Sequence, residues 1–276
     1  MKTVREILKL SLMHVSDQRP RHEVEWLIAY ALGVSRLDLY LRFDRPVEEA
    51  ELAKIRSGIS RLKKGEPLAY VRGLAPFFRE EFVVSKDVLI PRPETEILVE
   101  EACSFLASRT TPGVLFDVGT GSGCIGLSVK KLFPEWNVIL SDISPEALSI
   151  AKINAERLKV SVECLLGDLL SPFHSKAACV IANPPYLSEC EWKQGDRTVR
   201  EYEPKLALVG GTTGLEWYER FFAQVFQYLC EGSCILVEIG STQGQAVTSL
   251  AQAHHFSKIQ LIKDLAHHDR VVKAVL

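Results

Sequence analysis

The chain has 276 residues, of which 47% are hydrophobic and 25% charged, a composition typical of a globular protein with one large domain or two smaller ones. A net charge of −2 and a pI near 6.4 argue against a dedicated nucleic-acid-binding protein. Seven cysteines, an odd number without a CxxC pair, exclude a disulfide framework and a zinc site, so we expect no metal. We find no signal peptide and no membrane-length apolar run, and therefore expect a cytoplasmic protein that contacts no membrane.

Residues 1–75 carry apolar side chains at helical spacing, for example Val4, Ile7, Leu8 and Leu12. Gly33 and the region of Pro46 supply breaks, so we predict three or four amphipathic helices packed as a small bundle. The segment holds 14 basic and 10 acidic residues, and the rest of the chain therefore has six more acidic than basic residues. A basic surplus is typical of a solvated helical surface, or of a face that docks an acidic partner. We predict a substrate-docking domain over 1–75.

The pattern changes at Pro67, after which aromatic and β-branched residues are typical of strands. Two apolar runs, 77–84 and 88–90, flank a turn expected near Ser85-Lys86-Asp87. Residues 76–91 are therefore predicted to form a β-hairpin that connects two domains. The next stretch, Pro91 to Glu96, by itself predicts only a helix start, with prolines in the first turn and acids near the positive helix end.

From about residue 95 the predicted elements alternate. Strands are expected at 114–118, 138–142, 162–166, 178–182 and 233–239, followed by two terminal strands. Helices are expected at about 95–108, from a glycine-rich loop to Phe133, and at 144–158, 214–230 and 243–253, while the segment 187–213 stays unassigned. Such alternation predicts a parallel sheet covered by helices on both faces, an α/β Rossmann-like domain over 92–276.

A glycine-rich loop follows the first strand of this region. Residues 121–126 match G-x-G-x-x-G, and Asp142 lies about twenty residues further on, which fits the dinucleotide-binding fingerprint. A nicotinamide-dependent enzyme is therefore a competing prediction. Asp117 and Gly119 extend the pattern to D-x-G-x-G-x-G. A carboxylate at this place repels a pyrophosphate but favours the sulfonium and ammonium groups of S-adenosyl-L-methionine.

Two further acids extend the cofactor prediction. Asp142, after the second strand, can accept hydrogen bonds from both ribose hydroxyls in either interpretation. Gly167-Asp168-Leu169, after the third strand, is placed for an adenine, with a carboxylate for its amino group and an apolar side chain for its face. The alternative interpretation of Asp168 is a simple turn residue.

The tetrapeptide Asn183-Pro184-Pro185-Tyr186 follows the fourth strand, which its two prolines terminate. Asn-Pro is also a common turn starter, so the tetrapeptide alone predicts a turn and a binding site equally. At the carboxyl edge of an α/β sheet, where ligands bind, it offers neutral hydrogen-bond acceptors and an aromatic ring, which suit a substrate with an NH2 group. The side-chain oxygen of Asn183 and the carbonyl of Pro184 would each accept one N–H of that group, and the Tyr186 ring would pack against its plane. These three residues are the catalytic candidates.

The glycine pattern together with NPPY resembles the amino-group methyltransferases that use S-adenosylmethionine. A wider set resembles the HemK/PrmC family, namely Leu89-Ile90-Pro91-Arg92-Pro93-Glu94-Thr95-Glu96, NPPY, Glu203-Pro204 with Ala207-Leu208, and Gly214-Leu215 with Tyr218. The resemblance implies a cofactor site of Asp117, Gly119, Thr120, Gly121, Ser122, Gly123, Asp142, Ile143, Asp168, Leu169 and Asn183. It also implies a substrate site of Asn183, Pro184, Pro185 and Tyr186, with Arg92 and Pro93 shaping its end. The family often has an aromatic residue at position 169 and a glycine before the histidine of Ala266-His267-His268-Asp269-Arg270.

The activity that this resemblance implies is glutamine methylation of class I peptide chain release factors. A methyl group would pass from S-adenosyl-L-methionine to the side-chain amide nitrogen of the Gly-Gly-Gln motif, leaving S-adenosyl-L-homocysteine. The partner would be a translation termination factor, without direct nucleic-acid contact, and the enzyme would be a monomer. Alternatives are a ribosomal-protein glutamine methyltransferase, an adenine amino-methyltransferase acting on a flipped base, and a non-catalytic cofactor-binding module. An enzyme acting on nucleic acid would need a strongly basic groove, and the surplus of acidic residues in 76–276 argues against one.

Overall fold

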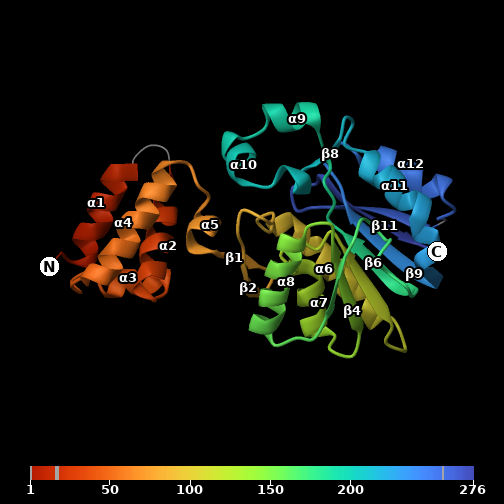
Figure 1. Ribbon diagram of the computed structural model, residues 1–276, viewed down its shortest axis with the longest axis horizontal. Helices are drawn as coiled ribbons and strands as arrows, with labels where there is room; N and C mark the ends of the chain where they lie inside the picture. Colours follow the sequence, from red (N-terminus) through yellow and green to blue (C-terminus); the bar gives the residue numbers. More distant parts are fainter. Residues whose placement is uncertain (1, 16–18, 257) are drawn as a thin grey trace. The chain divides into compact units, whose positions relative to one another are not determined.

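The computed structural model describes residues 2–15, 19–256 and 258–276. The chain divides into two compact units, Met1–Leu74 and Ala75–Leu276, each with its own apolar core (Figure 1). Within the described ranges, no helix is long and apolar enough to cross a lipid bilayer. No cluster of three or more His, Cys, Asp or Glu side chains in the same ranges is arranged to hold a metal ion.

The first unit is helical, as predicted, but it has more helices than expected. They are α1 (Val4–Val15), α2 (Arg21–Leu32), α3 (Arg36–Leu41), α4 (Glu49–Lys63) and α5 (Leu68–Arg72). The short helices α3 and α5 escaped prediction because six and five residues contain too little of the helical period. A capping box of Ser35 and Asp38 starts α3, and Gly33, with a φ of 64°, ends α2. Local capping therefore sets the boundaries that periodicity alone left open.

The β-hairpin is shorter than predicted, and a different turn joins its strands. Strand β1 (Leu74–Phe77) pairs with β2 (Glu80–Val83), so the hairpin turn lies at 78–79. The turn predicted near Ser85 does form, with the N–H of Val88 donating to the Ser85 carbonyl at 3.1 Å, but it joins no strand pair. The physical reason is burial of Phe77 and Phe82, which are 2% and 0% exposed and pack edge to face with ring centroids 6.1 Å apart. Residues 84–92, which include the predicted second strand, contain no strand.

The second unit is built on a seven-stranded sheet with the order β10-β11-β9-β6-β3-β4-β5 (Figure 1). The strands are β3 (Val114–Val118), β4 (Asn137–Asp142), β5 (Glu163–Leu166), β6 (Ala177–Ala182), β9 (Leu229–Glu238), β10 (Lys258–Lys263) and β11 (Asp269–Val275). The α/β prediction is confirmed. The prediction of a uniformly parallel sheet was wrong, because β11 runs antiparallel to both β9 and β10. The turn between β10 and β11 is too short for the crossover that a parallel pair needs.

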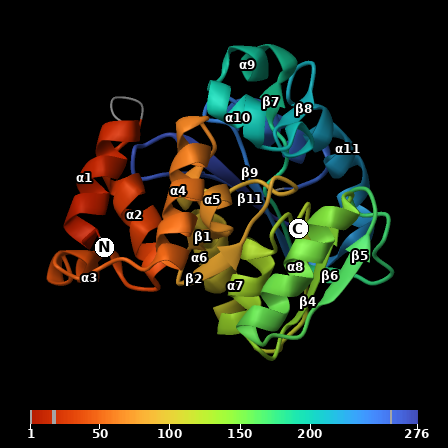
Figure 2. The same cartoon turned by 60° about the vertical axis from the view of Figure 1, so that its left-hand side comes forward.

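Helices cover both faces of this sheet. They are η2 (Pro93–Thr95), α6 (Glu96–Ala107), α7 (Cys124–Leu132), α8 (Pro145–Leu158), α11 (Glu216–Val225), η4 (Phe226–Tyr228) and α12 (Gly244–Ala253). Successive strand residues face opposite layers, so Leu115 packs with α6, α7 and α8 while Phe116 packs with α11 and α12. Figure 2 shows α7 and α8 side by side over β4. With both faces covered, the strand ends remain as the place for a ligand.

The segment that the sequence left unassigned forms short elements at one end of the sheet (Figures 1 and 2). They are β7 (Leu187–Ser188), α9 (Glu189–Gln194), α10 (Arg197–Tyr202), η3 (Lys205–Ala207) and β8 (Val209–Gly211). β7 and β8 pair in parallel, with Leu187 opposite Val209, and so close the segment into a loop that follows directly on NPPY. Elements of two to six residues carry almost no periodic signal, which explains why they were not predicted.

Glu203 anchors this loop to the stretch before η2. Its side chain is buried, and its Oε1 accepts a hydrogen bond from Arg92 Nη2 at 2.5 Å. Its Oε2 accepts another from the backbone N–H of Ile90 at 3.2 Å. This second bond occupies an N–H that the predicted strand at 88–90 would have needed, which is a further reason why that strand is absent. One carboxylate therefore ties together two segments more than a hundred residues apart.

We predict that Glu203→Ala lowers the free energy of unfolding by about 1–3 kcal/mol, because it leaves the partly buried N–H of Ile90 and the Arg92 guanidinium without their acceptor. Thermal unfolding measures the change. Glu201→Ala on α10 is the matched control, since its ion pair with Arg197 is solvent-exposed and should contribute little. Equal losses from the two substitutions would contradict the anchoring role of Glu203.

Candidate functional site

A cavity of about 430 Å³ opens at the carboxyl ends of β3, β4, β5 and β6, within the size range of small-molecule sites. Predicted site residues that line it are Gly119, Thr120, Gly121, Ser122, Asp142, Ile143, Asp168, Leu169, Asn183, Pro184 and Pro185. The cavity thus brings together residues from the predicted cofactor site and from NPPY. Five predicted residues are absent from its lining, namely Asp117, Gly123, Tyr186, Arg92 and Pro93.

The glycine loop after β3 presents bare backbone to this cavity. Gly119 and Gly121 have φ values of 71° and 55°, and a Cβ atom built on either would meet no other atom within 4 Å. Side chains at these two positions would therefore project into open space beside the loop, which leaves room for a ligand to approach the main chain. Gly123 differs, because its Cβ would come within 2.7 Å of Leu127. It serves the packing of α7 and does not border the cavity.

Asp117 does not face the cavity as expected; it is buried beneath the loop. Its Oδ2 accepts hydrogen bonds from Thr120 Oγ1 at 2.6 Å and from the backbone N–H of Gly126 at 2.9 Å. Burial raises the pKa of this carboxyl to about 6. Its Oδ1 has no hydrogen-bond partner among the described residues. Asp117 lies near the end of β3, as predicted, but its side chain turns toward α7 and ties the loop to that helix.

Asp142 fixes the other side of the loop. Its Oδ2 accepts the backbone N–H of Gly121 at 2.8 Å, and its Oδ1 accepts that of Ser144 at 2.9 Å. Burial raises the pKa of the carboxyl, and these two N–H groups oppose that shift. Each oxygen keeps a second lone pair, so the carboxylate can still accept hydrogen bonds from a diol in the cavity. Ile143, half exposed beside it, offers an apolar surface to the same space.

The loop after β5 supplies an ion pair to the lining. Asp168 pairs with Arg220 of α11, and both border the cavity, so this acid is more than an isolated turn residue. Leu169 follows it with a φ of 52°, a left-handed conformation that is unusual for leucine. The Leu169 side chain is only 4% exposed and packs into the core, so it presents little surface to a ring in the cavity.

Asn183 is the residue of NPPY whose side chain has a defined orientation. Its Nδ2 donates a hydrogen bond to Thr95 Oγ1 at 3.1 Å, and Thr95, at the end of η2, is buried. No donor among the described residues contacts the Asn183 side-chain oxygen or the Pro184 carbonyl. Two acceptors at the edge of the cavity are therefore unoccupied by protein. In the sequence, Thr95 belongs to the motif 89–96, but nothing in the sequence predicted its hydrogen bond with Asn183.

Tyr186 lies behind the cavity and is held through its backbone. Its carbonyl accepts a hydrogen bond from Gln243 Nε2 at 2.8 Å, and its ring packs against the core on the α11 side. Burial raises the pKa of its hydroxyl to about 12, so the phenol stays protonated at neutral pH. A Cβ on Gly214 would lie 2.3 Å from the same carbonyl, which explains why glycine follows the loop at that point. Tyr186 thus fixes the path of the chain beyond the prolines.

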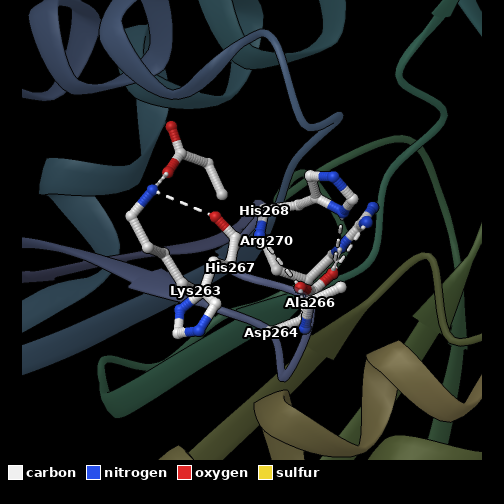
Figure 3. A network of polar contacts seen from close by, with 7 residues as sticks. Lys263, Asp264, Ala266, His267, His268 and Arg270 are labelled. Atoms are coloured by element: carbon white, nitrogen blue, oxygen red, sulfur yellow. Dashed lines mark hydrogen bonds and ion pairs between the residues drawn. The ribbon is translucent and has the colours of Figure 1, made fainter.

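The turn between β10 and β11, to which the sequence assigned no role, is closed by Asp264 (Figure 3). Its Oδ1 accepts the backbone N–H groups of Ala266 and His268, and its Oδ2 accepts Arg270 Nε and Nη2 at 3.2 and 3.0 Å. These hydrogen bonds, with that from His268 first, lower the pKa of Asp264. His267 has a φ of 64°, in the left-handed region that glycine adopts most readily. The turn therefore holds the Arg270 guanidinium in one place.

Glu238, at the end of β9, was not recognised from the sequence. Its side chain is buried, and its Oε2 has no hydrogen-bond partner among the described residues. Thr95, the residue that also contacts Asn183, lies near this side chain. Burial raises the pKa of Glu238 to about 7. The one available signal was an acid inside the apolar run 235–239, at the carboxyl end of a predicted strand.

Comparison with known proteins adds two domain matches. Residues 8–73 match the PrmC N-terminal domain, and residues 95–201 match the methyltransferase small domain. Two similar proteins are named release factor glutamine methyltransferase. The one from Geobacter sulfurreducens is 35% identical over 98% of this chain and 95% of its own length. The one from Bacillus subtilis is 36% identical over 100% of this chain and 99% of its own length.

Solved structures support the fold. A methyltransferase from Pyrococcus furiosus superposes with a TM-score of 0.50 and 15% identity, covering 83% of this chain and 98% of that one. The T. thermophilus 16S rRNA N2 G1207 methyltransferase, solved with AdoMet and guanosine, gives a TM-score of 0.52 at 13% identity and covers 73% of this chain and 49% of that one. At such identities the likeness concerns the fold alone. Full-length identity above 30% is a stronger criterion, and by it this chain belongs to the release factor glutamine methyltransferase family.

Proposed function

We propose that this protein methylates the side-chain amide nitrogen of the glutamine in the Gly-Gly-Gln motif of class I peptide chain release factors. S-adenosyl-L-methionine is the methyl donor and S-adenosyl-L-homocysteine the product. Family membership supports the reaction class and the type of partner. The observation that carries the proposal for the site is the pair of unoccupied acceptors, Asn183 Oδ1 and the Pro184 carbonyl, beside the glycine loop.

These acceptors match the two N–H groups of a primary amide. An amide nitrogen is a poor nucleophile, because its lone pair is delocalised into the carbonyl. Hydrogen bonds from both N–H groups to Asn183 and Pro184 would orient the nitrogen and increase its electron density. When bound, S-adenosylmethionine supplies a methyl group on a sulfonium, which needs no further activation. Positioning and exclusion of water then supply most of the rate, and the amide proton leaves to water.

The cavity also fits the proposed methyl donor. The bare backbone at Gly119 and Gly121 leaves space against the loop, and Asp142 retains acceptor capacity for ribose hydroxyls. The carboxyl of Asp117 lies under this loop, where its negative charge, when ionised, favours a cationic ligand over a pyrophosphate. We assign cofactor contacts to Gly119, Thr120, Gly121, Ser122, Asp142, Ile143 and Asp168, and an indirect role to Asp117 and Gly123.

We predict that calorimetry detects binding of S-adenosylmethionine and none of NAD. Asp142→Ala should weaken S-adenosylmethionine binding by about 10- to 100-fold, because it removes charged acceptors from the ribose and frees the loop. Asp168→Ala is the matched comparison. It should have a similar effect if this carboxylate contacts the adenine amino group, and a small one if it only pairs with Arg220. Tight binding of NAD without any response to S-adenosylmethionine would overturn the cofactor assignment.

We predict that Asn183→Ala lowers kcat by about 100-fold, the cost of losing one hydrogen bond that acts on the reacting group, with little change in cofactor affinity. The measurement is transfer of labelled methyl to a release factor, a ribosomal protein and DNA, offered side by side. Near-normal turnover of the variant would remove Asn183 from the mechanism. Labelling of the ribosomal protein or the DNA in preference to the release factor would reject the proposed substrate.

We further propose that the first unit, Met1–Leu74, docks the release factor. Besides its basic surplus, this unit exposes an aromatic surface on α2, where Trp26 and Tyr30 are 39% and 46% exposed. The guanidinium of Arg72 lies 5.2 Å from the Trp26 ring centre and 5.8 Å from that of Tyr30. Tryptophan, tyrosine and arginine are the residues that most often dominate binding at protein interfaces. We call these three residues the docking cluster.

We predict that replacing both Trp26 and Tyr30 by alanine lowers kcat/KM on a whole release factor by about tenfold or more and leaves kcat/KM on a short loop peptide unchanged. The peptide reaches the site without docking, so only the whole factor should respond. Met13→Ala on α1 is the control, because this exposed side chain lies outside the docking cluster. Equal losses on factor and peptide would mean that the cluster stabilises the enzyme and does not dock its partner.

A further inference from the structure

The proposed reaction needs two acceptors, and one of them belongs to the main chain. Asn183 can be oriented through its own side chain, whereas the direction of the Pro184 carbonyl follows from the backbone torsions around it. Neither Pro184 nor Pro185 has a backbone N–H, so neither can be held by a hydrogen bond that it donates. The direction of the Pro184 carbonyl therefore depends on how the two ends of the tetrapeptide are fixed.

The end before the prolines is fixed by the central sheet. The last residue of β6, Ala182, is paired with Val118 of β3 on one side and with Val237 of β9 on the other. Each proline ring fixes the φ angle of its own residue, so few torsions remain free between the sheet and Tyr186. If the far end at Tyr186 is also fixed, the Pro184 carbonyl has little freedom to turn.

Gln243, the residue before α12, fixes that far end with its side-chain amide. Its Nε2 donates to the Tyr186 carbonyl at 2.8 Å and to the Gly214 carbonyl at 3.3 Å. Its Oε1 accepts the backbone N–H of Gly240, just after β9, at 2.9 Å. Since β9 is the neighbour of β6 in the sheet, this side chain closes a ring that leaves the sheet at β6 and returns to it at β9.

Close packing leaves the tetrapeptide little room to adjust. A Cβ atom on Gly210 of β8 would lie 2.3 Å from the Pro185 carbonyl oxygen, and one on Gly214 would lie 2.3 Å from that of Tyr186. Main chain therefore packs directly on main chain at both places. The pairing of β7 with β8 holds the loop after the tetrapeptide to itself, and Gln243 connects that loop to the sheet.

We propose that Gln243 is a positioning residue for methyl transfer, which by holding the Tyr186 carbonyl directs the Pro184 carbonyl at one N–H of the substrate amide. This inference rests on the proposed function. Gln243 does not line the cavity, so its effect passes through the main chain of the tetrapeptide. The amide nitrogen gains positive charge as it takes the methyl group, and its N–H groups then become stronger donors. The direction of the acceptor therefore matters more in the transition state than in the bound substrate.

The kinetic test uses two substitutions of similar size. Gln243→Met removes the donor and the acceptor, whereas Gln243→Glu keeps an acceptor for Gly240 but turns a negative oxygen toward two carbonyls. On a short loop peptide, kcat should fall about tenfold in Gln243→Met and about 100-fold in Gln243→Glu. KM and the affinity for S-adenosylmethionine should stay within about twofold of the wild type, because the ground-state contacts are unchanged. If Gln243 only filled space, Gln243→Glu would be the milder change, since glutamate has the shape of glutamine.

Val247→Ala, one turn further along α12, is the control for lost stability. Val247 is fully buried in the apolar core, and its side chain has no hydrogen-bonding group. Its truncation should lower the melting temperature at least as much as Gln243→Met does. At an assay temperature well below both transitions, kcat of Val247→Ala should equal that of the wild type.

A second measurement needs neither methyl donor nor substrate. Labelling tyrosine with carbon-13 at the carbonyl and leucine with nitrogen-15 gives one NMR signal for each Tyr-Leu pair, and the sequence has three pairs, at 40–41, 186–187 and 228–229. The signal of the pair 186–187 is identified by its loss in Tyr186→Phe. Its carbonyl frequency should move in Gln243→Met, because that carbonyl has lost its donor, while the other two signals stay in place.

Wild-type kcat in both Gln243 variants would overturn the inference. So would equal losses of kcat in Val247→Ala and Gln243→Met, or a Gln243→Glu enzyme more active than Gln243→Met. If the wild type methylates neither a release factor nor its loop peptide but the carbonyl signal moves, the proposed function fails while the tie between Gln243 and the tetrapeptide stands. If the wild type methylates the factor and the signal moves without any change in kcat, the inference fails and the proposed function stands.

Discussion

The register of the central sheet determines which side chains can meet at the site. β3 and β6 are paired so that Gly119 and Asn183 leave the sheet side by side. The β3–β4 pairing brings Asp142 next to the same glycine, and the β6–β9 pairing brings Glu238 next to Asn183. Asp142, Gly119, Asn183 and Glu238 therefore lie in one row across four neighbouring strands. A slip of one residue in any of these pairings would turn a strand's side chains to the opposite face and break the row.

Two buried carboxyls, those of Asp117 and Glu238, lie in or next to this row of residues. Burial raises the pKa of the first to about 6 and that of the second to about 7. Because both values lie above those of ordinary carboxyls, their stabilising contribution is complete in acid and is lost as pH rises through 6 and 7. The ionised forms of these two carboxyls are thus the forms that the fold stabilises least. Positional demands of the site, and not stability, account for acids at these two places.

The sequence was sufficient for the chain order of the sheet strands and of the long helices that cover them, because most of these elements are long enough to show their period, unlike the short elements within 187–213. NPPY and the glycine loop were placed at the correct sheet edge for the same reason. What could not be predicted depends on tertiary contacts. Asp117 was given a direct ligand contact, yet its side chain faces α7. The hairpin turn lies at 78–79 and not at 85–87, because the strands on either side of it bury two phenylalanines against each other. Glu238 had no neighbour visible in the sequence, since Thr95, which lies near it, is more than a hundred residues away in the chain.

The choice of neutral acceptors at the site has a physical consequence. A carboxylate in place of Asn183 would attract the cationic methyl donor directly and would compete with the substrate amide for the same space. An amide oxygen and a backbone carbonyl avoid this attraction, and their hydrogen bonds depend on direction more than on charge. The Pro184 carbonyl is fixed by the backbone, and Asn183 is free to turn about its last torsion. The direction of the Asn183 amide therefore depends on Thr95, whose hydroxyl oxygen accepts its Nδ2 at 3.1 Å.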